Sequence, residues 1–250
     1  MLRRAVESLK IGLDGEKHDE NQYISLISDI LLHGEEIVGR NGTTKAVFGA
    51  AMVFNLEDGT LPLLTTKKVA WKTCLKELLW FIKGCTDNDV LREQKVRIWD
   101  GNASREFLDS RGLNHLEEGD LGPVYGHQWR HFNAEYKTRH DDYTGKGVDQ
   151  LQYVIDELKD PEKRSSRRII MSAWNPCQLN EMALPPCHVL CQFNVIGDKL
   201  SCSLYQRSGD VGLGVPFNIA SYSFLTHLLA KHCGLQAHEF VYYLGNTHIY

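Results

Sequence analysis

The chain has 250 residues; 42% of them are hydrophobic, 24% are charged, and the formal net charge at pH 7 is −4. These values are typical of a soluble globular protein with one large domain, or at most two small ones. The acidic balance argues against a general nucleic-acid binder. No run approaches the ~18 consecutive apolar residues of a membrane span.

The amino-terminal segment holds two arginines but no apolar run long enough for a secretory signal. We expect residues 1–20 to be a flexible polar tail, with a weak transit segment as the alternative.

The seven cysteines are odd in number, irregularly spaced, and contain no CxxC pair. This pattern indicates free thiols in a reducing compartment rather than a disulfide scaffold or a metal site. We therefore expect a cytoplasmic protein, with the nucleus as a second compartment.

Apolar periodicity predicts the regular elements in chain order. Residues 22–38 have helical spacing, residues 46–56 form a strand, and residues 70–84 form a strongly apolar helix. Residues 85–147 are rich in glycine, aspartate and asparagine and predict loops and short helices. A further amphipathic helix covers residues 148–161.

The rest of the chain predicts a strand over residues 167–175, a helix over 218–235 and a last strand over 239–245. Helices and strands mix without a regular βαβ alternation. This order favours an α+β fold in one domain.

The stretch ALPPCHVLCQF (183–193) places two prolines directly before Cys187 and a histidine behind it. Successive side chains of a strand point to opposite faces, so His188 is not the direct base for Cys187. Cys191 lies about 13 Å along the same face, too far for a shared metal or a disulfide. A buried structural cysteine is the alternative, and we assign that role to Cys74, Cys191, Cys202 and Cys233.

A predicted hairpin favours a chemical role for Cys187. Residues 187–195 and 200–207 flank a glycine-first turn at Gly197-Asp198. Pairing residues whose numbers sum to about 395 brings Arg207 and Ser208 beside Cys187. A guanidinium lowers the pKa of a nearby thiol, and an arginine next to a serine suits a phosphate. The stretch therefore predicts a thiolate nucleophile beside an anion pocket.

The segments RRIIMSAWNP, MALPPCH and LYQRSGDVGLGVPFNIASY closely resemble the thymidylate synthase family. PLLTTKK, ELLWFIKG, IWD, GDLGPVYGHQWRHF and the terminal HIY extend the resemblance over about residues 20–250. It implies a single α+β domain at 21–250, built on a mixed, largely antiparallel β-sheet flanked by helices. It also implies reductive methylation of dUMP to dTMP by 5,10-methylenetetrahydrofolate, with dihydrofolate as product and no metal.

In this family a cysteine thiolate adds to C6 of the uracil, which makes C5 nucleophilic. The resemblance gives that role to Cys187 and the proton transfers to Glu77, for which surface exposure is the alternative. It places Tyr125 and His188 in the hydrogen-bond network around the cysteine. The catalytic residues that it implies are Cys187, Glu77, Arg207, Asp210, His188 and Tyr125.

The resemblance also implies residues that bind dUMP. Arg40, Arg207 and Ser208 would hold the phosphate, and Arg167 and Arg168 would reach it from the other subunit of a homodimer. Solvated surface charge is the alternative for the last two. Asn218 would read the uracil edge, with a helix N-cap as the alternative, and His248 and Tyr250 would hold the deoxyribose hydroxyl.

The folate would lie in the same cleft, with its pterin ring held by Asp210. Plain core packing is an equal alternative for the apolar residues that would line the cleft. The lining residues that the resemblance implies are Ile98, Trp99, Asn102, Leu184, Gly214 and Phe217.

The sequence departs from the family pattern in three places. The loop after Arg40 is one residue shorter, and Asn246 stands where an aspartate is usual. Family members also continue beyond the HIY motif, whereas this chain ends at Tyr250. We therefore expect the domain to be truncated at its carboxy terminus and to have little or no activity as it stands.

Two other functions fit the same residues. Deoxycytidylate hydroxymethylase shares the thiolate chemistry, although an aspartate in place of Asn218 would suit the cytosine amino group better. A non-catalytic nucleotide- or RNA-binding remnant is the second alternative, suggested by the early end of the chain.

Overall fold

A computed structural model of the chain describes residues 18–39 and 42–250. Residues 1–17 of the expected tail and Arg40 lie outside the described residues. Within that part of the chain, no helix is both long and apolar enough to cross a membrane.

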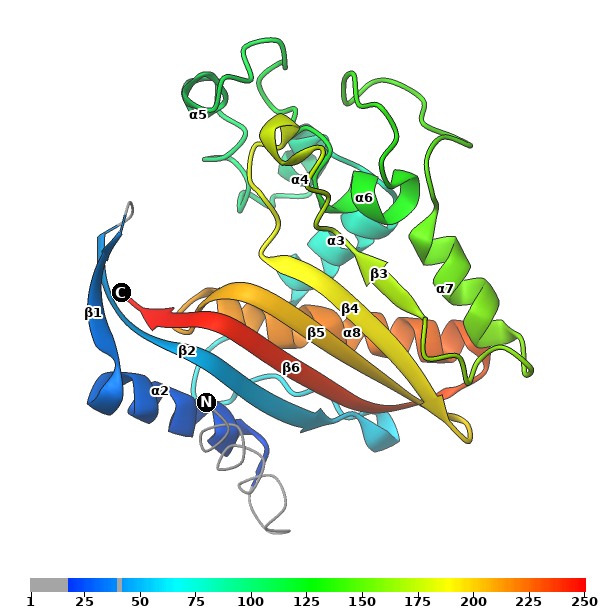
Figure 1. Ribbon diagram of the computed structural model, residues 1–250. Helices are drawn as coiled ribbons and strands as arrows, with labels where there is room; N and C mark the ends of the chain where they lie inside the picture. Colours follow the sequence, from blue (N-terminus) through cyan, green and yellow to red (C-terminus); the bar gives the residue numbers. More distant parts are fainter. Residues whose placement is uncertain (1–17, 40–41) are drawn as a thin grey trace.

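One six-stranded sheet forms the centre of the molecule (Figure 1). The strand order is β1-β2-β6-β5-β4-β3, and every neighbouring pair is antiparallel except β5 with β6. This arrangement confirms the expected mixed, largely antiparallel sheet. The strands are β1 (Glu35–Gly39), β2 (Gly42–Asn55), β3 (Ile170–Ser172), β4 (His188–Ile196), β5 (Lys199–Asp210) and β6 (Gln236–Ile249).

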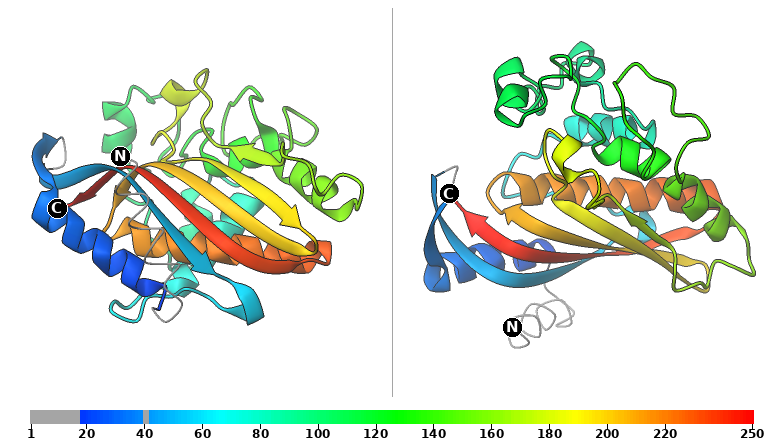
Figure 2. Two further views of the ribbon diagram at one scale, coloured as in Figure 1. Left: turned by 60° about the horizontal axis from the view of Figure 1, so that its bottom comes forward. Right: turned by 45° about the horizontal axis from the view of Figure 1, so that its top comes forward.

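Helices cover one face of this sheet, with α8 lying along its length in both views of Figure 2. Because α8 is held between the sheet and α3, most of its side chains are buried, as an apolar helix requires. The short helices α4 and α5 gather with α3 and α6 at one end of the molecule (Figure 1). The helices are α2 (Glu20–His33), α3 (Trp71–Ile82), α4 (Asn88–Glu93), α5 (Arg105–Ser110), α6 (Tyr125–His131), α7 (Gln150–Lys159) and α8 (Gly214–Cys233), with 3-10 turns η1 (Glu57–Gly59) and η2 (Leu179–Glu181).

The prediction of a helix over residues 22–38 is confirmed up to His33 and wrong for residues 34–38. The helix ends at His33, Gly34 is extended, and residues 35–39 form β1, which pairs with β2. A Cβ on Gly34 would lie 2.4 Å from the carbonyl oxygen of Ile30, so the chain turns away from the helix only with glycine there. The β-branched Ile37 and Val38 then extend in the hairpin.

Other expected boundaries shift by a few residues. The helix expected over 218–235 already begins at Gly214, and the strand expected over 239–245 extends to Ile249. The strand expected over 167–175 is shortened to three residues. The predicted helices at 70–84 and 148–161 are confirmed as α3 and α7.

The hairpin of β4 and β5 has the predicted register. Gly197, in the turn, has a φ of +67°, which glycine adopts without strain. Ile196 pairs with Lys199 and Leu190 pairs with Tyr205, after which a bulge shifts the register. Beyond the bulge the amide of Arg207 donates to the carbonyl of Cys187 at 2.9 Å. The two residues are therefore adjacent, as the sequence predicts.

Candidate active site

A cavity of about 600 Å³ opens where the end of β5, the start of α8 and the end of β6 meet α3. Fifteen of the residues expected at the site line this one cavity, although they come from distant parts of the sequence. They are Glu77, Ile98, Trp99, Asn102, Tyr125, Leu184, Cys187, His188, Ser208, Asp210, Gly214, Phe217, Asn218, His248 and Tyr250.

Cys187 lies at the end of the Pro-Pro segment, one residue before β4 begins. The hydroxyl oxygen of Tyr125, from α6, accepts hydrogen bonds from the amides of Cys187 at 2.7 Å and His188 at 3.3 Å. The backbone on both sides of the thiol is therefore fixed by one phenol.

Burial raises the pKa of the Cys187 thiol, and the positive charge of Arg207 only partly offsets that effect. The expectation that Arg207 leaves the thiol with a lowered pKa is therefore wrong in its net direction. Sequence register predicts the neighbouring charge but not the loss of water around the sulfur. A proton must leave this thiol before it can act as a nucleophile.

Arg207 also holds the backbone that presents the thiol. Its Nε donates to the carbonyl of Pro186 at 2.9 Å and its Nη2 to that of Pro185 at 3.0 Å. The guanidinium lies over the ring of Trp174, with 5.6 Å between its central carbon and the ring centroid. Arg207 therefore ties β5 to the Pro-Pro segment as well as bringing a positive charge.

His188 is buried between the rings of Tyr125 and Tyr222, whose centroids lie 5.3 and 5.2 Å from its own. Burial lowers the pKa of His188 to about 4, opposed by a hydrogen bond with Asn218. The imidazole is therefore neutral near pH 7. A neutral ring suits a hydrogen-bonding role in the cavity wall.

Glu77 is buried within α3, with 7% of its surface exposed. Its Oε1 accepts a hydrogen bond from the indole Nε1 of Trp99 at 2.7 Å. Burial raises the pKa of Glu77 to about 7, although the Trp99 hydrogen bond lowers it. The alternative of surface exposure is excluded. A carboxyl group with this pKa can both give and take a proton at neutral pH.

Asn218 is the fifth residue of α8, and Leu213 occupies the N-cap position, so the N-cap alternative for Asn218 is wrong. Its Oδ1 lies 3.5 Å from the hydroxyl of Tyr242, which donates to Gln206 at 2.5 Å. The Asn218 amide thus faces the cavity from within a polar network.

Asp210 and His248 also line the cavity, side by side on the paired strands β5 and β6. The Oδ1 of Asp210 accepts from the amides of Gly212 and Leu213 at 2.8 and 3.1 Å, which fixes the turn into α8. The Nδ1 of His248 is 2.9 Å from Asn246, and its ring meets Tyr250 edge-on. Asn246, where the family usually has aspartate, therefore contacts one of the expected ribose ligands.

Residues 21–250 match the family model described as thymidylate synthase. The chain belongs to the thymidylate synthase family. It is 57% identical to a human thymidylate synthase over 93% of this chain and 74% of the relative. It is 55% identical to thymidylate synthase 1/2 of Encephalitozoon cuniculi over 94% of this chain and 79% of the relative.

A bifunctional dihydrofolate reductase-thymidylate synthase of Zea mays is 57% identical over 94% of this chain but only 45% of the relative. The chain thus spans about half the length of such bifunctional relatives.

The arginines expected at the phosphate do not gather around the cavity as the other expected residues do. Arg40 lies outside the described residues. Arg167 and Arg168 are exposed just before β3, and neither is among the cavity-lining residues of the described chain. Their place beside a sheet edge leaves them accessible to a second molecule.

The sequence did not predict three of the residues that line the cavity, which are Phe81, Gln206 and Leu213. Gln206 could have been found, because a strand turns alternate residues to one face and Ser208 and Asp210 were already expected in the cleft. Phe81 follows Glu77 by one helical turn, which is a similar signal. Leu213 lies in an irregular turn without such periodicity.

Groups of three or more side chains able to hold a metal ion are absent from the described part of the chain.

Proposed function

We propose that this chain converts dUMP to dTMP with 5,10-methylenetetrahydrofolate, releasing dihydrofolate, through a covalent bond between the Cys187 sulfur and uracil C6. Membership of the thymidylate synthase family supports the reaction. The main support for the proposal is that one cavity holds the thiol of Cys187, the carboxyl of Glu77 with a pKa of about 7, and the carboxamide of Asn218. These are the groups that addition, proton transfer and recognition of an imide edge require.

The residues act in a definite order in this proposal. The Cys187 thiolate adds to C6, and the electron pair moves through C5 toward O4, so C5 becomes nucleophilic. Asn218 pairs with N3 and O4 of the uracil, because its amide offers one acceptor and one donor. Glu77 exchanges protons with the pyrimidine, through water where it is out of direct reach.

The cavity wall fits the folate. Trp99, Leu184 and Phe217 form an apolar surface for a flat ring, and the carboxylate of Asp210 can accept from ring N–H groups. The bound folate supplies the one-carbon unit and then the hydride that completes the methyl group.

The dUMP phosphate would meet Ser208 and Arg207, with Arg40 from the preceding hairpin. In a homodimer Arg167 and Arg168 would reach the partner's site. The face of β3 to β6 turned to the viewer in Figure 1 carries no helix of the described chain. Ile170, Tyr205 and Tyr243 are exposed on these strands, and the strand register places them on one common face of the sheet. An apolar sheet face of this kind suits burial against a second copy.

Tritium release from C5-labelled dUMP, with the folate present, tests the reaction. Release by the parent chain, with only background release by Cys187→Ser, would support the proposal and overturn the expectation of little or no activity drawn from the sequence. A parent that binds dUMP without releasing tritium would contradict the proposal and favour a binding role. Release of label from dCMP instead of dUMP would favour the hydroxymethylase.

Mixing two inactive variants tests the shared site. Arg168→Ala and Cys187→Ser chains should regain activity when mixed, because one of the two sites in a hybrid dimer is complete. Failure to regain activity, with dimers present in sedimentation, would place Arg168 outside the partner's site.

A further inference from the structure

The turn over residues 98–102 forms one wall of the cavity and supplies Ile98, Trp99 and Asn102 to it. Trp99 is the residue of this turn that touches Glu77, through the indole hydrogen bond of 2.7 Å. The amides of Asn102 and Ala103 both donate to the carbonyl of Trp99, at 3.0 and 2.9 Å. Two backbone hydrogen bonds therefore close the turn on the residue that carries the indole.

Asp100 anchors this turn to α4. Its Oδ1 accepts from the Nδ2 of Asn88 at 2.9 Å and from the Nε of Arg92 at 2.8 Å. Asn88 is fully buried, whereas Arg92 is partly exposed and brings a charge. Asp100 follows Trp99 directly in the chain, so its anchor fixes the backbone that carries the indole.

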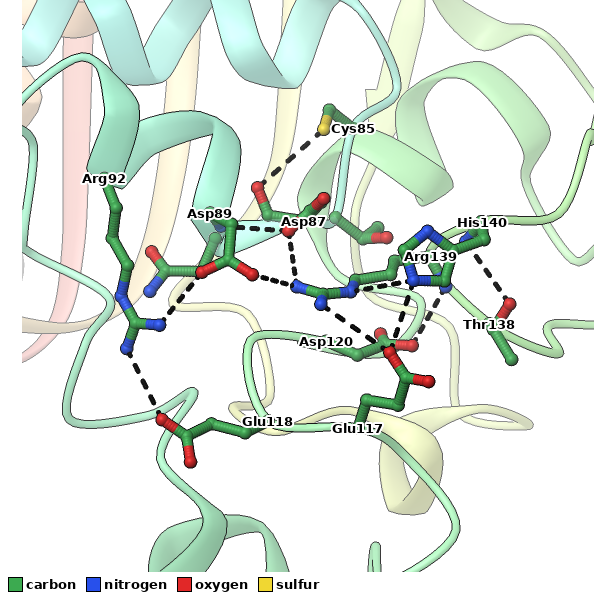
Figure 3. Close-up of polar contacts among 12 residues, drawn as sticks. Cys85, Asp87, Asp89, Arg92, Glu117, Glu118, Asp120, Thr138, Arg139 and His140 are labelled. Carbon is green, nitrogen blue, oxygen red and sulfur yellow. Dashed lines mark hydrogen bonds and ion pairs between the residues drawn. The ribbon is translucent and has the colours of Figure 1, made fainter.

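Arg92 belongs to a longer chain of alternating charges (Figure 3). Its Nη1 donates to Asp89 Oδ1 at 2.9 Å, and Asp89 Oδ2 accepts from Arg139 at 2.7 Å. The same nitrogen of Arg139 donates to Asp87 at 2.6 Å. Arg139 has only 10% of its side chain exposed, so this end of the chain of charges is held rigidly.

We propose that Arg92 is a positioning residue: by holding Asp100 to α4, it keeps the neighbouring Trp99 in place as the hydrogen-bond donor to Glu77. The inference rests on the proposed function for its catalytic meaning, but the contact between Trp99 and Glu77 can be measured without turnover. A merely structural role for Arg92 would stabilise α4 and leave Glu77 unchanged.

The chain offers a matched control for this role. Arg97 approaches the same carboxylate, with its Nη1 4.0 Å from Asp100 Oδ2, but 82% of its side chain is exposed. Its removal takes away the same charge without removing a hydrogen bond. Arg92→Lys is the complementary variant. It keeps the positive charge but loses the guanidinium, whose separate nitrogens bind Asp89 and Asp100.

Few other titratable groups lie close enough to Glu77 to affect its ionisation. Cys74, one turn earlier on α3, and Tyr125, on α6, interact with it electrostatically. Cys187, His188, Asp210 and His248 line the same cavity. No arginine or lysine is among the described lining residues, so the Trp99 hydrogen bond is the contact that favours ionised Glu77.

The test is a pH titration of tryptophan fluorescence, read as the difference between each protein and its Trp99→Phe counterpart. The parent should show a transition near pH 7 that Glu77→Gln abolishes. In Arg92→Ala the transition should move up by about one pH unit, the effect of losing a charge-assisted hydrogen bond. Arg92→Lys should move it part of the way, and Arg97→Ala should leave it in place.

Asp100→Asn provides a second variant that keeps the shape of the anchor, and thermal unfolding at pH 7 verifies that each variant is folded. Equal transitions in the parent and in folded Arg92→Ala would overturn the proposal, as would equal shifts in Arg92→Ala and Arg97→Ala. The absence of any transition that depends on Trp99 would overturn it too. None of these results needs tritium release, so failure of the proposed reaction remains a separate finding.

Discussion

The Nε of Arg207 lies 2.9 Å from the carbonyl oxygen of Pro186, the residue directly before Cys187. The guanidinium thereby reaches the thiol in two ways, through its charge and through the backbone that carries the sulfur. The amides that follow the two prolines, those of Cys187 and His188, donate to the Tyr125 hydroxyl, while the carbonyls of Pro185 and Pro186 accept from Arg207. Arg207 satisfies both carbonyls.

Arg207→Ala should therefore make Cys187 less reactive at neutral pH. Arg207 lowers the pKa of this thiol against the effect of burial, so its loss raises that pKa further. Alkylation of Cys187 by iodoacetamide, followed by peptide mass spectrometry over a pH series, should shift to higher pH. Arg207→Lys should fall between the two proteins, and Arg97→Ala should match the parent. An unchanged pH profile in Arg207→Ala would mean that the guanidinium acts on the backbone alone.

Glu77→Gln should make the folded protein more stable at alkaline pH. The pKa of Glu77 is about 7 in the folded state against an ordinary 4.5, so folding favours the protonated carboxyl. Its contribution is fully present below pH 4.5 and is lost as the pH rises through 7. From 4.5 to 7 the loss amounts to about 3 kcal/mol.

The neutral amide of the variant does not ionise, so the variant does not lose this stability as the pH rises. The amide oxygen can still accept the hydrogen bond from Trp99. Urea unfolding of parent and Glu77→Gln should give similar free energies near pH 5 and the larger value for the variant near pH 8. A buried carboxyl that weakens the fold is expected where the group is kept for its chemistry. A variant that is less stable at both pH values would contradict the assigned pKa.

Several parts of the fold could be predicted because their causes are local. The register of β4 and β5 follows from one glycine-first turn, and α7 follows from apolar spacing and a terminal proline. Because Ser208 and Asp210 were expected in the cleft, alternation along β5 could also have identified Gln206. These features need only a few neighbouring residues.

Other features depend on segments that are distant in the sequence. Residues 35–39 continue the helical spacing of α2, and only pairing with β2 makes them a strand. The raised pKa of Cys187 depends on burial by several elements together. Arg139 meets Asp87 across fifty-two positions of a region that the sequence presents as loops. Tertiary packing decides each of these cases.

Glu20 anchors the loop before α3, and its removal should destabilise the fold. Its carboxylate accepts from the amide and the hydroxyl of both Thr65 and Thr66, at 2.5 to 3.0 Å. Burial alone would raise the pKa of Glu20, yet these hydrogen bonds bring it from 4.5 down to about 2. The resulting stability is present above pH 4.5 and is lost as the pH falls through 2.

Glu20→Gln should therefore cost about 2–3 kcal/mol in the free energy of unfolding at pH 7, and this difference should shrink toward pH 2. Chemical denaturation at a series of pH values measures it. Glu36→Gln, an exposed position on β1, is the control and should change little. A difference between Glu20→Gln and the parent that is independent of pH would show that shape, not charge, anchors the loop.

Gly119 lies directly against the guanidinium of Arg139. A Cβ on Gly119 would be 2.3 Å from Arg139 Nη1 and 3.0 Å from Asp89 Oδ2, at a φ of +93°. The arginine tip could move aside, but only by leaving Asp87 and Asp89. Gly112 is a matched control, because its φ is +74° and a Cβ there would meet nothing within 4 Å.

Gly112→Ala should thus cost about 1 kcal/mol for the left-handed backbone alone. Gly119→Ala should cost about 1–2 kcal/mol more, because the displaced Arg139 leaves Asp87 without its cation and Asp89 with Arg92 alone. In an Arg139→Met background the extra cost of Gly119→Ala should fall, since the ion pairs are already gone. Urea unfolding of the four proteins of this cycle measures the coupling. Additive effects of Gly119→Ala and Arg139→Met would show that glycine is needed at position 119 for its backbone conformation and not to leave room for the Arg139 ion pairs.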